Sequence, residues 1–168
     1  MKIYIIRHSE TKHNKERLFQ GWKDTELSQK GINDAKNKAK NFPQDFDVCF
    51  SSTLKRAKDT AKILVPYLDI IYDKRIMERK LGEYEGTIVT QDKLRSLDLD
   101  KPPKDAESIK DIDDRVSDFI KTIKSEYKDK KVLVVTHAGT ILSFMRVLHL
   151  SYFGLGNLEM KEIEIWWR

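Results

Sequence analysis

The sequence predicts an α/β protein, a three-layer α/β/α sandwich whose central sheet is mostly parallel with an antiparallel strand at one edge. Three observations lead to this prediction. Short apolar runs suited to buried strands alternate with longer segments of helical periodicity. The run Val132–Val135 is unbroken, as in a strand that is buried on both faces. No repeat, low-complexity segment or linker divides the 168 residues, so we expect one domain over residues 1–168.

The predicted strands are four short apolar runs and one alternating segment at an edge: Lys2–Ile6, Asp47–Phe50, Asp69–Tyr72, Lys131–Thr136 and Leu158–Trp167. The predicted helices lie between them: Ser28–Asn41, Leu54–Leu68, Val89–Leu97, Ser108–Tyr127 and Gly139–Leu150. The helix that begins at Ser108 has the strongest signal, because its apolar residues recur every three or four positions. Ser28 and Ser108 are the expected N-caps, since a serine hydroxyl accepts a free N–H group of the first turn.

Positive and negative charges are interleaved along the chain. The sequence has 32 basic and 27 acidic side chains, which give a formal net charge of +5. A nucleic-acid-binding protein would show a basic stripe or arm with aromatic side chains that stack on bases, and neither occurs. A lysine-rich surface explains the mild excess, and a small anionic substrate is also compatible with it. We therefore expect no nucleic-acid partner.

Cys49 is the one cysteine of the chain, and it lies in the apolar run Val48–Phe50. It excludes a disulfide framework and a Cys-ligated zinc site, so we expect a buried thiol that packs as a small apolar group. The first seven residues have no small-residue cleavage site, and no apolar stretch reaches the length of a membrane span. We expect a cytoplasmic protein without a membrane partner.

Basic side chains follow three of the predicted strands. The first strand runs into Arg7 and His8, the second is followed within one turn by Arg56, and the fourth runs into His137. In open α/β sheets, ligands bind beyond the carboxyl ends of the strands. Such a cluster repels itself unless an anion or carboxylates lie at its centre, and guanidinium groups match phosphate oxygens. The sequence therefore predicts a phosphate site at this edge of the sheet.

Longer motifs resemble those of the histidine phosphatase superfamily, in the branch that contains phosphoglycerate mutase and related small phosphatases. The residues that carry this resemblance are Arg7-His8-Ser9-Glu10-Thr11 and Asn14; Arg17, Gln20, Gly21, Trp22, Asp24 and Leu27; Ser52, Leu54, Arg56, Ala57, Thr60 and Ala61; Glu78, Gly82, Glu85 and Gly86; Glu107-Ser108; and Val135-Thr136-His137-Ala138-Gly139. The matches follow the family order over nearly the whole chain. Ser9 and Ala106 stand where the family usually has glycine, and we expect small effects from either.

The resemblance implies a mechanism without a metal or another cofactor. His8 would attack phosphorus as a neutral imidazole and form a phosphohistidine that water then hydrolyses. Arg7, Arg56 and a protonated His137 would hold the nonbridging oxygens. Glu78 would protonate the leaving oxygen and then help to deprotonate water. The remaining substrate-binding positions implied by the resemblance are Asn14, Gln20, Gly21 and Ala138.

Two features around this site stay open at the level of sequence. Glu83 is the main rival of Glu78 for the acid role, because the loop carries several charges. Trp22, the acid loop and the segment Val89–Leu97 are expected to border the substrate pocket. The substrate is a small phosphorylated metabolite whose identity the motifs do not specify. A homodimer is also conceivable, through an apolar patch formed by Tyr152, Phe153, Trp166 and Trp167.

Three other functions compete with a phosphatase. A phosphoglycerate mutase shares the catalytic cluster. Mutases, however, carry a longer insertion than this chain between the acid loop and the Glu-Ser segment. A binding protein without turnover is a second alternative, although no member of the cluster is missing. A metal-dependent hydrolase is the third, and the histidines lack the His-Glu-x-x-His spacing that one such class uses. The sequence favours the phosphatase.

Overall fold

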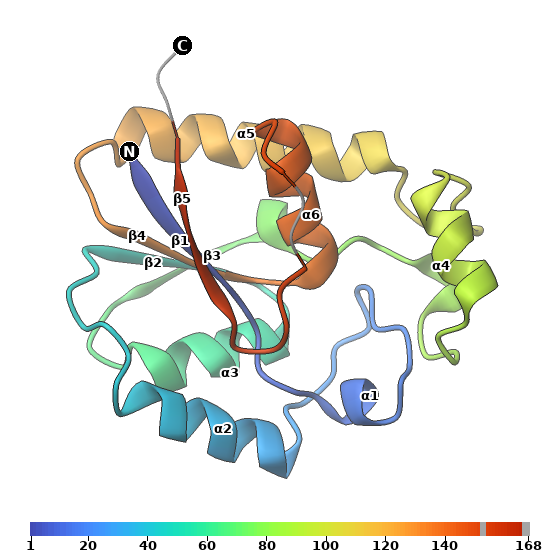
Figure 1. Ribbon diagram of the computed structural model, residues 1–168, viewed down its shortest axis with the longest axis horizontal. Helices are drawn as coiled ribbons and strands as arrows, with labels where there is room; N and C mark the ends of the chain where they lie inside the picture. The colour runs from blue at the N-terminus through green and yellow to red at the C-terminus, as the bar shows by residue number, and fades with distance from the viewer. Residues whose placement is uncertain (152–153, 166–168) are drawn as a thin grey trace.

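A five-stranded sheet lies at the centre of the computed structural model, which describes residues 1–151 and 154–165 (Figure 1). The strands are β1 (Lys2–Arg7), β2 (Val48–Ser52), β3 (Ile70–Asp73), β4 (Val132–Thr136) and β5 (Met160–Glu164), in the spatial order β3-β2-β4-β1-β5. Strands β1 to β4 are parallel, and β5 pairs antiparallel with β1 at the edge. This confirms the predicted sheet.

Helices cover both faces of the sheet. The α-helices are α1 (Lys12–Lys15), α2 (Gln29–Ala39), α3 (Lys55–Leu64), α4 (Gln91–Asp98), α5 (Ile109–Glu126) and α6 (Ala138–Val147), and the 3₁₀ turns are η1 (Lys74–Ile76) and η2 (Gly82–Tyr84). Figure 1 shows α5 and α6 above the sheet and α2 and α3 below it, which confirms the three layers. None of these helices is long and apolar enough to span a membrane.

The alternation of side chains along the strands divides the core into two clusters. Ile3 and Ile5 of β1 pack in the cluster that contains the apolar stripes of α5 and α6. Ile6 joins the opposite cluster, which contains the buried face of α3. Successive residues of a strand point to opposite faces, so an unbroken apolar run supplies both layers. Cys49 is buried in the second cluster, and burial raises the pKa of its thiol to about 12, as expected for a packing residue.

Most predicted elements differ from the structure only at their ends. Ser28 and Ser108 are the N-caps of α2 and α5, as predicted. The helix predicted to reach Leu68 ends at Leu64, because Val65 precedes Pro66 and a residue before proline is disfavoured in the helical region. Strand β2 continues to Ser52 because Ser51 pairs with both neighbouring strands and Ser52 pairs with Asp73 of β3.

The chain after His8 contains a short helix that the sequence analysis did not predict. Helix α1 has four residues, too few to show a periodic apolar pattern. Thr11 caps it, and Asn14 completes the capping box through its own side chain. The apolar patch that was expected to favour a homodimer lies outside the described residues. It consists of Tyr152, Phe153, Trp166 and Trp167.

Candidate active site

The register of the sheet brings the two predicted catalytic histidines together. Arg7 at the end of β1 lies opposite Thr136 at the end of β4, so His8 and His137 leave the sheet side by side. The backbone N–H of His8 donates to the carbonyl of Thr136 (2.9 Å), and the two imidazole rings lie 5.1 Å apart between centroids. The predicted convergence at this edge is therefore present in the fold.

His8 has one ring nitrogen engaged and one available. Its Nδ1 lies 2.7 Å from the carbonyl oxygen of Ser9, which can only accept, so Nδ1 carries the proton and Nε2 keeps its lone pair. The residue is 2% exposed and lines a pocket. Burial, with further contributions from Arg56 and Arg7, holds the pKa of His8 well below its ordinary value of 6.5. The imidazole is neutral near neutral pH, which is the state that a nucleophile requires.

Ser9 is accommodated although the family usually has glycine at this position. Its carbonyl orients His8, as expected, and its hydroxyl donates to the carbonyl of Gly31 (2.7 Å). Its backbone N–H donates to the hydroxyl of Thr60 on α3 (3.0 Å). The serine therefore links the loop after β1 to α2 and α3. The second departure, Ala106, forms an isolated antiparallel bridge with Leu81.

Arg7 has a polar atom without a partner beside the pocket. Its Nη1 donates to the carbonyl of Leu155 (3.0 Å), but its buried Nε has no hydrogen-bond partner among the described residues. Burial lowers the pKa of this guanidinium. An unpaired buried N–H is costly, and an anion in the pocket would satisfy it.

Arg56 and His137 lie behind the pocket rather than on its wall. Both are fully buried, and the Nε of Arg56 donates to the Nδ1 of His137 (3.2 Å). The two Nη atoms of Arg56 donate to the carbonyls of Lys23 (3.1 Å) and Gly21 (2.7 Å). Burial lowers the pKa of Arg56 to about 10, so the guanidinium is charged at neutral pH.

The hydrogen bonds of His137 favour a neutral ring, whereas its protonation while it holds phosphoryl oxygens stays a prediction. Burial and the neighbouring Arg56 hold the pKa of His137 well below 6.5, and its Nδ1 accepts a hydrogen bond from that guanidinium. The proton of the neutral ring is therefore on Nε2, which lies 2.8 Å from the hydroxyl of Ser52. A charged guanidinium on Arg56 at this hydrogen-bond distance favours the neutral form of His137 over the imidazolium.

Glu78 rather than Glu83 faces the pocket. The carboxylate of Glu78 accepts hydrogen bonds from the backbone N–H groups of Gly139 (3.3 Å) and Thr140 (3.2 Å) in the first turn of α6. Such a position suits a negative charge, because the N-terminus of a helix has free donors. Glu83 is exposed in η2, and Glu85 is turned away to accept from the backbone of Trp22 and Leu81.

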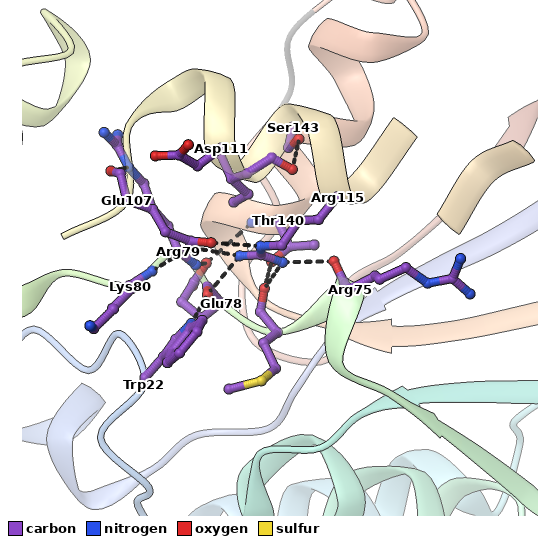
Figure 2. A network of polar contacts seen from close by, with 12 residues as sticks. Trp22, Arg75, Glu78, Arg79, Lys80, Glu107, Asp111, Arg115, Thr140 and Ser143 are labelled. Atoms are coloured by element: carbon purple, nitrogen blue, oxygen red, sulfur yellow. Dashed lines mark hydrogen bonds and ion pairs between the residues drawn. The ribbon is translucent and has the colours of Figure 1, made fainter. Parts of the chain in front are cut away.

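A side chain that the sequence analysis missed holds the backbone around Glu78. Arg115 of α5 donates to the carbonyls of Arg75 and Met77 (both 2.7 Å) and of Glu78 (2.9 Å), as Figure 2 shows. It also forms a two-pronged ion pair with Glu107. A charged residue at helical spacing from Ile112 and Phe119, on the apolar face of α5, is the signal that could have revealed it.

Four further predicted binding positions line the pocket: Asn14, Gln20, Gly21 and Ala138. The side-chain oxygen of Asn14 accepts from Thr11, and that of Gln20 accepts from Thr25, which leaves the amide NH₂ groups as donors. Gly21 has φ of +53°, and a Cβ there would lie 2.3 Å from Glu85 Oε1, so only glycine fits.

The pocket has a volume of about 480 Å³ and two chemically different ends. His8, Arg7 and Glu78 belong to a polar end. The other end is lined by the apolar side chains Leu18, Phe19, Leu81, Val89, Leu94, Leu97, Ile109 and Leu142. The prediction that the acid loop and the helix near Val89–Leu97 border the pocket is confirmed. Trp22 is not among the lining residues; its indole N–H donates to the carbonyl of Glu78 (2.7 Å) and supports the acid loop from outside (Figure 2).

The fold and the site define an α/β protein in which a buried histidine and an arginine line a pocket at the carboxyl ends of parallel strands. The model of the histidine phosphatase superfamily (branch 1) matches residues 3–165, and the chain belongs to this superfamily. Both mutases and phosphatases occur among the proteins it resembles.

The chain is 31% identical to a phosphoglycerate mutase of Schizosaccharomyces pombe, in an alignment that covers 97% of this chain and 84% of that protein. Among solved structures, the α-ribazole phosphatase of Shigella flexneri superposes with a TM-score of 0.83 at 25% identity and covers 98% of this chain and 90% of its own. A phosphoserine phosphatase of Entamoeba histolytica in complex with 3-phosphoglyceric acid gives a TM-score of 0.83 at 25% identity, over 96% and 89% of the two chains.

Proposed function

We propose that this protein is a cytoplasmic, metal-independent phosphatase that hydrolyses small phosphomonoesters through a phosphohistidine on His8. The observation that carries the proposal is the state of His8 at the pocket wall. Its Nδ1 is fixed by the carbonyl of Ser9, and its Nε2 is left with a lone pair at neutral pH. A fixed, neutral imidazole beside an unpaired arginine N–H suits in-line attack on a phosphoryl group.

The reaction proceeds in two displacements. In the first, Nε2 of His8 forms a bond to phosphorus while the bond to the leaving oxygen breaks, and Glu78 gives a proton to that oxygen. In the second, Glu78 takes a proton from water as the water oxygen attacks phosphorus, and the N–P bond breaks. Arg7 and the amide groups of Asn14 and Gln20 stabilise the phosphoryl oxygens. Preorganised donors of this kind usually supply the largest part of the rate enhancement.

Arg56 and His137 take part once the anion is bound. The two side chains share a hydrogen bond, and neither lines the pocket. A phosphoryl dianion near His8 attracts the charged guanidinium and favours protonation of His137, because an opposite charge stabilises the imidazolium. We therefore expect this hydrogen bond to be exchanged for contacts to the phosphoryl oxygens. The ¹⁵N resonances of His137 during a titration with vanadate are the measurement that checks this exchange.

The principal experiment measures hydrolysis of p-nitrophenyl phosphate by the wild type and by His8→Ala, each with excess EDTA. We expect turnover that resists the chelator and falls by about 10⁴-fold or more in the variant, by analogy with the removal of other nucleophiles. Wild-type enzyme quenched in alkaline detergent should carry a phosphoryl group that is stable in base and lost in acid, as phosphohistidine is, and His8→Ala should carry none. Activity that survives His8→Ala, or that EDTA abolishes, contradicts the mechanism.

A phosphoglycerate mutase is the second candidate, and the likeness to the mutase of S. pombe favours it. The two functions differ in the fate of the phosphoryl group. A mutase interconverts 2- and 3-phosphoglycerate with little release of phosphate, whereas a phosphatase releases phosphate from either. Both products are measured in one incubation with each phosphoglycerate, with and without 2,3-bisphosphoglycerate. Interconversion of the phosphoglycerates that is faster than phosphate release would show that the protein is a mutase and not a phosphatase.

A further inference from the structure

The apolar end of the pocket, defined by its lining, is formed by side chains from four separate parts of the chain. They come from the loop after α1, from α4 and the loop before it, from α5 and from α6. These residues are Leu18, Val89, Leu94, Leu97, Ile109 and Leu142. Leu94 is 36% exposed, so this lining reaches the mouth of the pocket. Whatever group is attached to a phosphate at His8 extends along these residues.

The two cationic side chains at this end are already engaged. Arg79 donates to the carbonyls of Glu107 (2.9 Å) and Leu97 (3.1 Å) and pairs with the carboxylate of Asp100 (3.1 Å). Arg146 forms a two-pronged pair with Asp113 through its Nε (2.9 Å) and Nη2 (2.6 Å). A carboxylate on a ligand would have to share either guanidinium with a group of this chain.

The third charged group at this end is a carboxylate. Asp98, at the end of α4, lines the pocket and carries the wrong sign for an anionic ligand. A ligand carboxylate here would lose its hydration, gain no unshared cation and lie near a like charge. Burial of an unpaired charge is far more costly than burial of an apolar group. The pocket is therefore ill suited to phosphoserine or a phosphoglycerate.

We propose that the substrates of this protein are phosphomonoesters of uncharged, predominantly apolar alcohols. This inference rests on the proposed phosphatase function and specifies the leaving group of that reaction. The apolar lining gains by removing an alkyl or aryl group from water, with about a fourfold gain in binding for each buried methylene. The paired arginines and Asp98 select against alcohols that carry a carboxylate.

The first experiment compares kcat/KM for three primary alkyl phosphates, n-hexyl phosphate, glycerol 3-phosphate and O-phosphoserine. All three have a primary alkoxide as leaving group, so differences in intrinsic reactivity are small. We expect n-hexyl phosphate to exceed each of the other two by about tenfold or more, because several methylenes are buried. An equal or higher value for O-phosphoserine would overturn the inference while leaving the phosphatase function intact.

A binding experiment separates this inference from the proposed function. Calorimetric titrations with hexylphosphonate and with 6-phosphonohexanoate, which differ by a terminal carboxylate, require no turnover. We expect hexylphosphonate to bind about tenfold more tightly, whether or not the protein hydrolyses any ester. Tighter binding without turnover would refute the phosphatase and support the apolar pocket. Equal affinities, or tighter binding of the carboxylate, would refute the apolar pocket alone.

Two leucines of the same segment provide a matched pair of variants. Leu94 lines the pocket, whereas Leu99 is 58% exposed and does not line it. We expect Leu94→Asn to lower kcat/KM for n-hexyl phosphate by about fivefold, and by a smaller factor for glycerol 3-phosphate, which has less apolar surface to bury. Leu99→Asn should change neither. Equal effects of the two substitutions would contradict the proposed contact between α4 and the leaving group.

The last variant tests whether the ion pair with Asp113 keeps Arg146 from binding a carboxylate on the substrate. Asp113→Asn keeps an oxygen that can accept from Ser143 but removes the charge that holds Arg146. If that pair withholds Arg146 from ligands, the variant should raise kcat/KM for O-phosphoserine relative to n-hexyl phosphate by about threefold or more. An unchanged ratio would show that the pairing of Arg146 does not select against carboxylates, which would overturn this part of the inference.

Discussion

The two ends of the pocket are built by different means. At the phosphate end, side chains leave the sheet directly after β1 and β4 and are held in place by buried hydrogen bonds, as with Nδ1 of His8 and the carbonyl of Ser9. At the leaving-group end, apolar side chains of α4 and the loops around it meet across distances that no strand register controls. The sheet positions the first end, and packing between loops and helices defines the second. In the proposed function, the residues that follow the strands carry out the reaction, and the residues of α4 and the loops around it select the substrate.

Glu78 belongs to the polar end with His8 and Arg7, and its removal should have the largest effect of the variants that follow. Glu78→Gln cannot donate or take the proton, so we expect kcat for alkyl phosphates to fall by about 10²- to 10⁴-fold. Esters of p-nitrophenol need little protonation of the leaving oxygen and should lose much less. Steady-state rates over a series of leaving groups measure this difference. A uniform loss across the series would mean that Glu78 is not the acid.

Arg115 is a positioning residue that acts through Glu78. Arg115→Lys keeps a charge for Glu107 but cannot reach the three backbone carbonyls at once, so we expect kcat to fall by about tenfold with little change in KM. The loss should again be larger for alkyl than for p-nitrophenyl esters, which a general weakening of the fold would not produce. Lys121→Met, on the exposed face of the same helix, is the control and should leave both rates unchanged.

Acid should lower the free energy of unfolding through the two buried histidines, His8 and His137. The pKa values of His8 and His137 lie below 6.5 in the folded protein because burial and Arg56 disfavour the imidazolium. Below about pH 6.5 the unfolded chain therefore binds protons that the folded chain does not, so stability is fully present above this pH and is lost as the pH falls. The free energy of unfolding should change by about 1.4 kcal/mol per pH unit for each histidine.

Urea denaturation at several pH values between 7.5 and 5 measures this slope. His8→Asn removes one of the two titrating groups and should lower the slope by about half. A slope that is the same in the variant, or a stability that does not depend on pH in this range, would show that the histidines are not the groups responsible.

The smallest effect is expected at Ser9. Ser9→Gly removes the hydrogen bond to the carbonyl of Gly31 but retains the backbone carbonyl that holds His8. We expect a loss of about 1 kcal/mol in the free energy of unfolding and a kcat within about twofold of the wild type. Thermal unfolding and steady-state kinetics measure the two quantities. A large loss of activity would mean that the serine hydroxyl has a role in orienting the nucleophile.

Much of the fold and of the phosphate end could be predicted from residue patterns. The apolar run Val132–Val135 and the periodic helix after Ser108 are local signals, and local signals survive in the folded state because they determine which face is buried. His8 and His137 could be placed together because parallel strands end at a common edge. Helix α1 was missed because four residues show no period.

The sequence by itself determined the order of strands and helices and the edge of the sheet at which Arg7, His8 and His137 converge. Only the tertiary structure decided that burial and Arg56 lower the pKa of His137, that Arg115 holds the loop of Glu78, and that Ile109 of α5 and Leu142 of α6 add to the apolar lining of the pocket. The physical reason is the range of the interactions. Periodicity and motifs depend on neighbours in the chain, whereas a pKa, a hydrogen bond between distant segments and the wall of a pocket depend on neighbours in space.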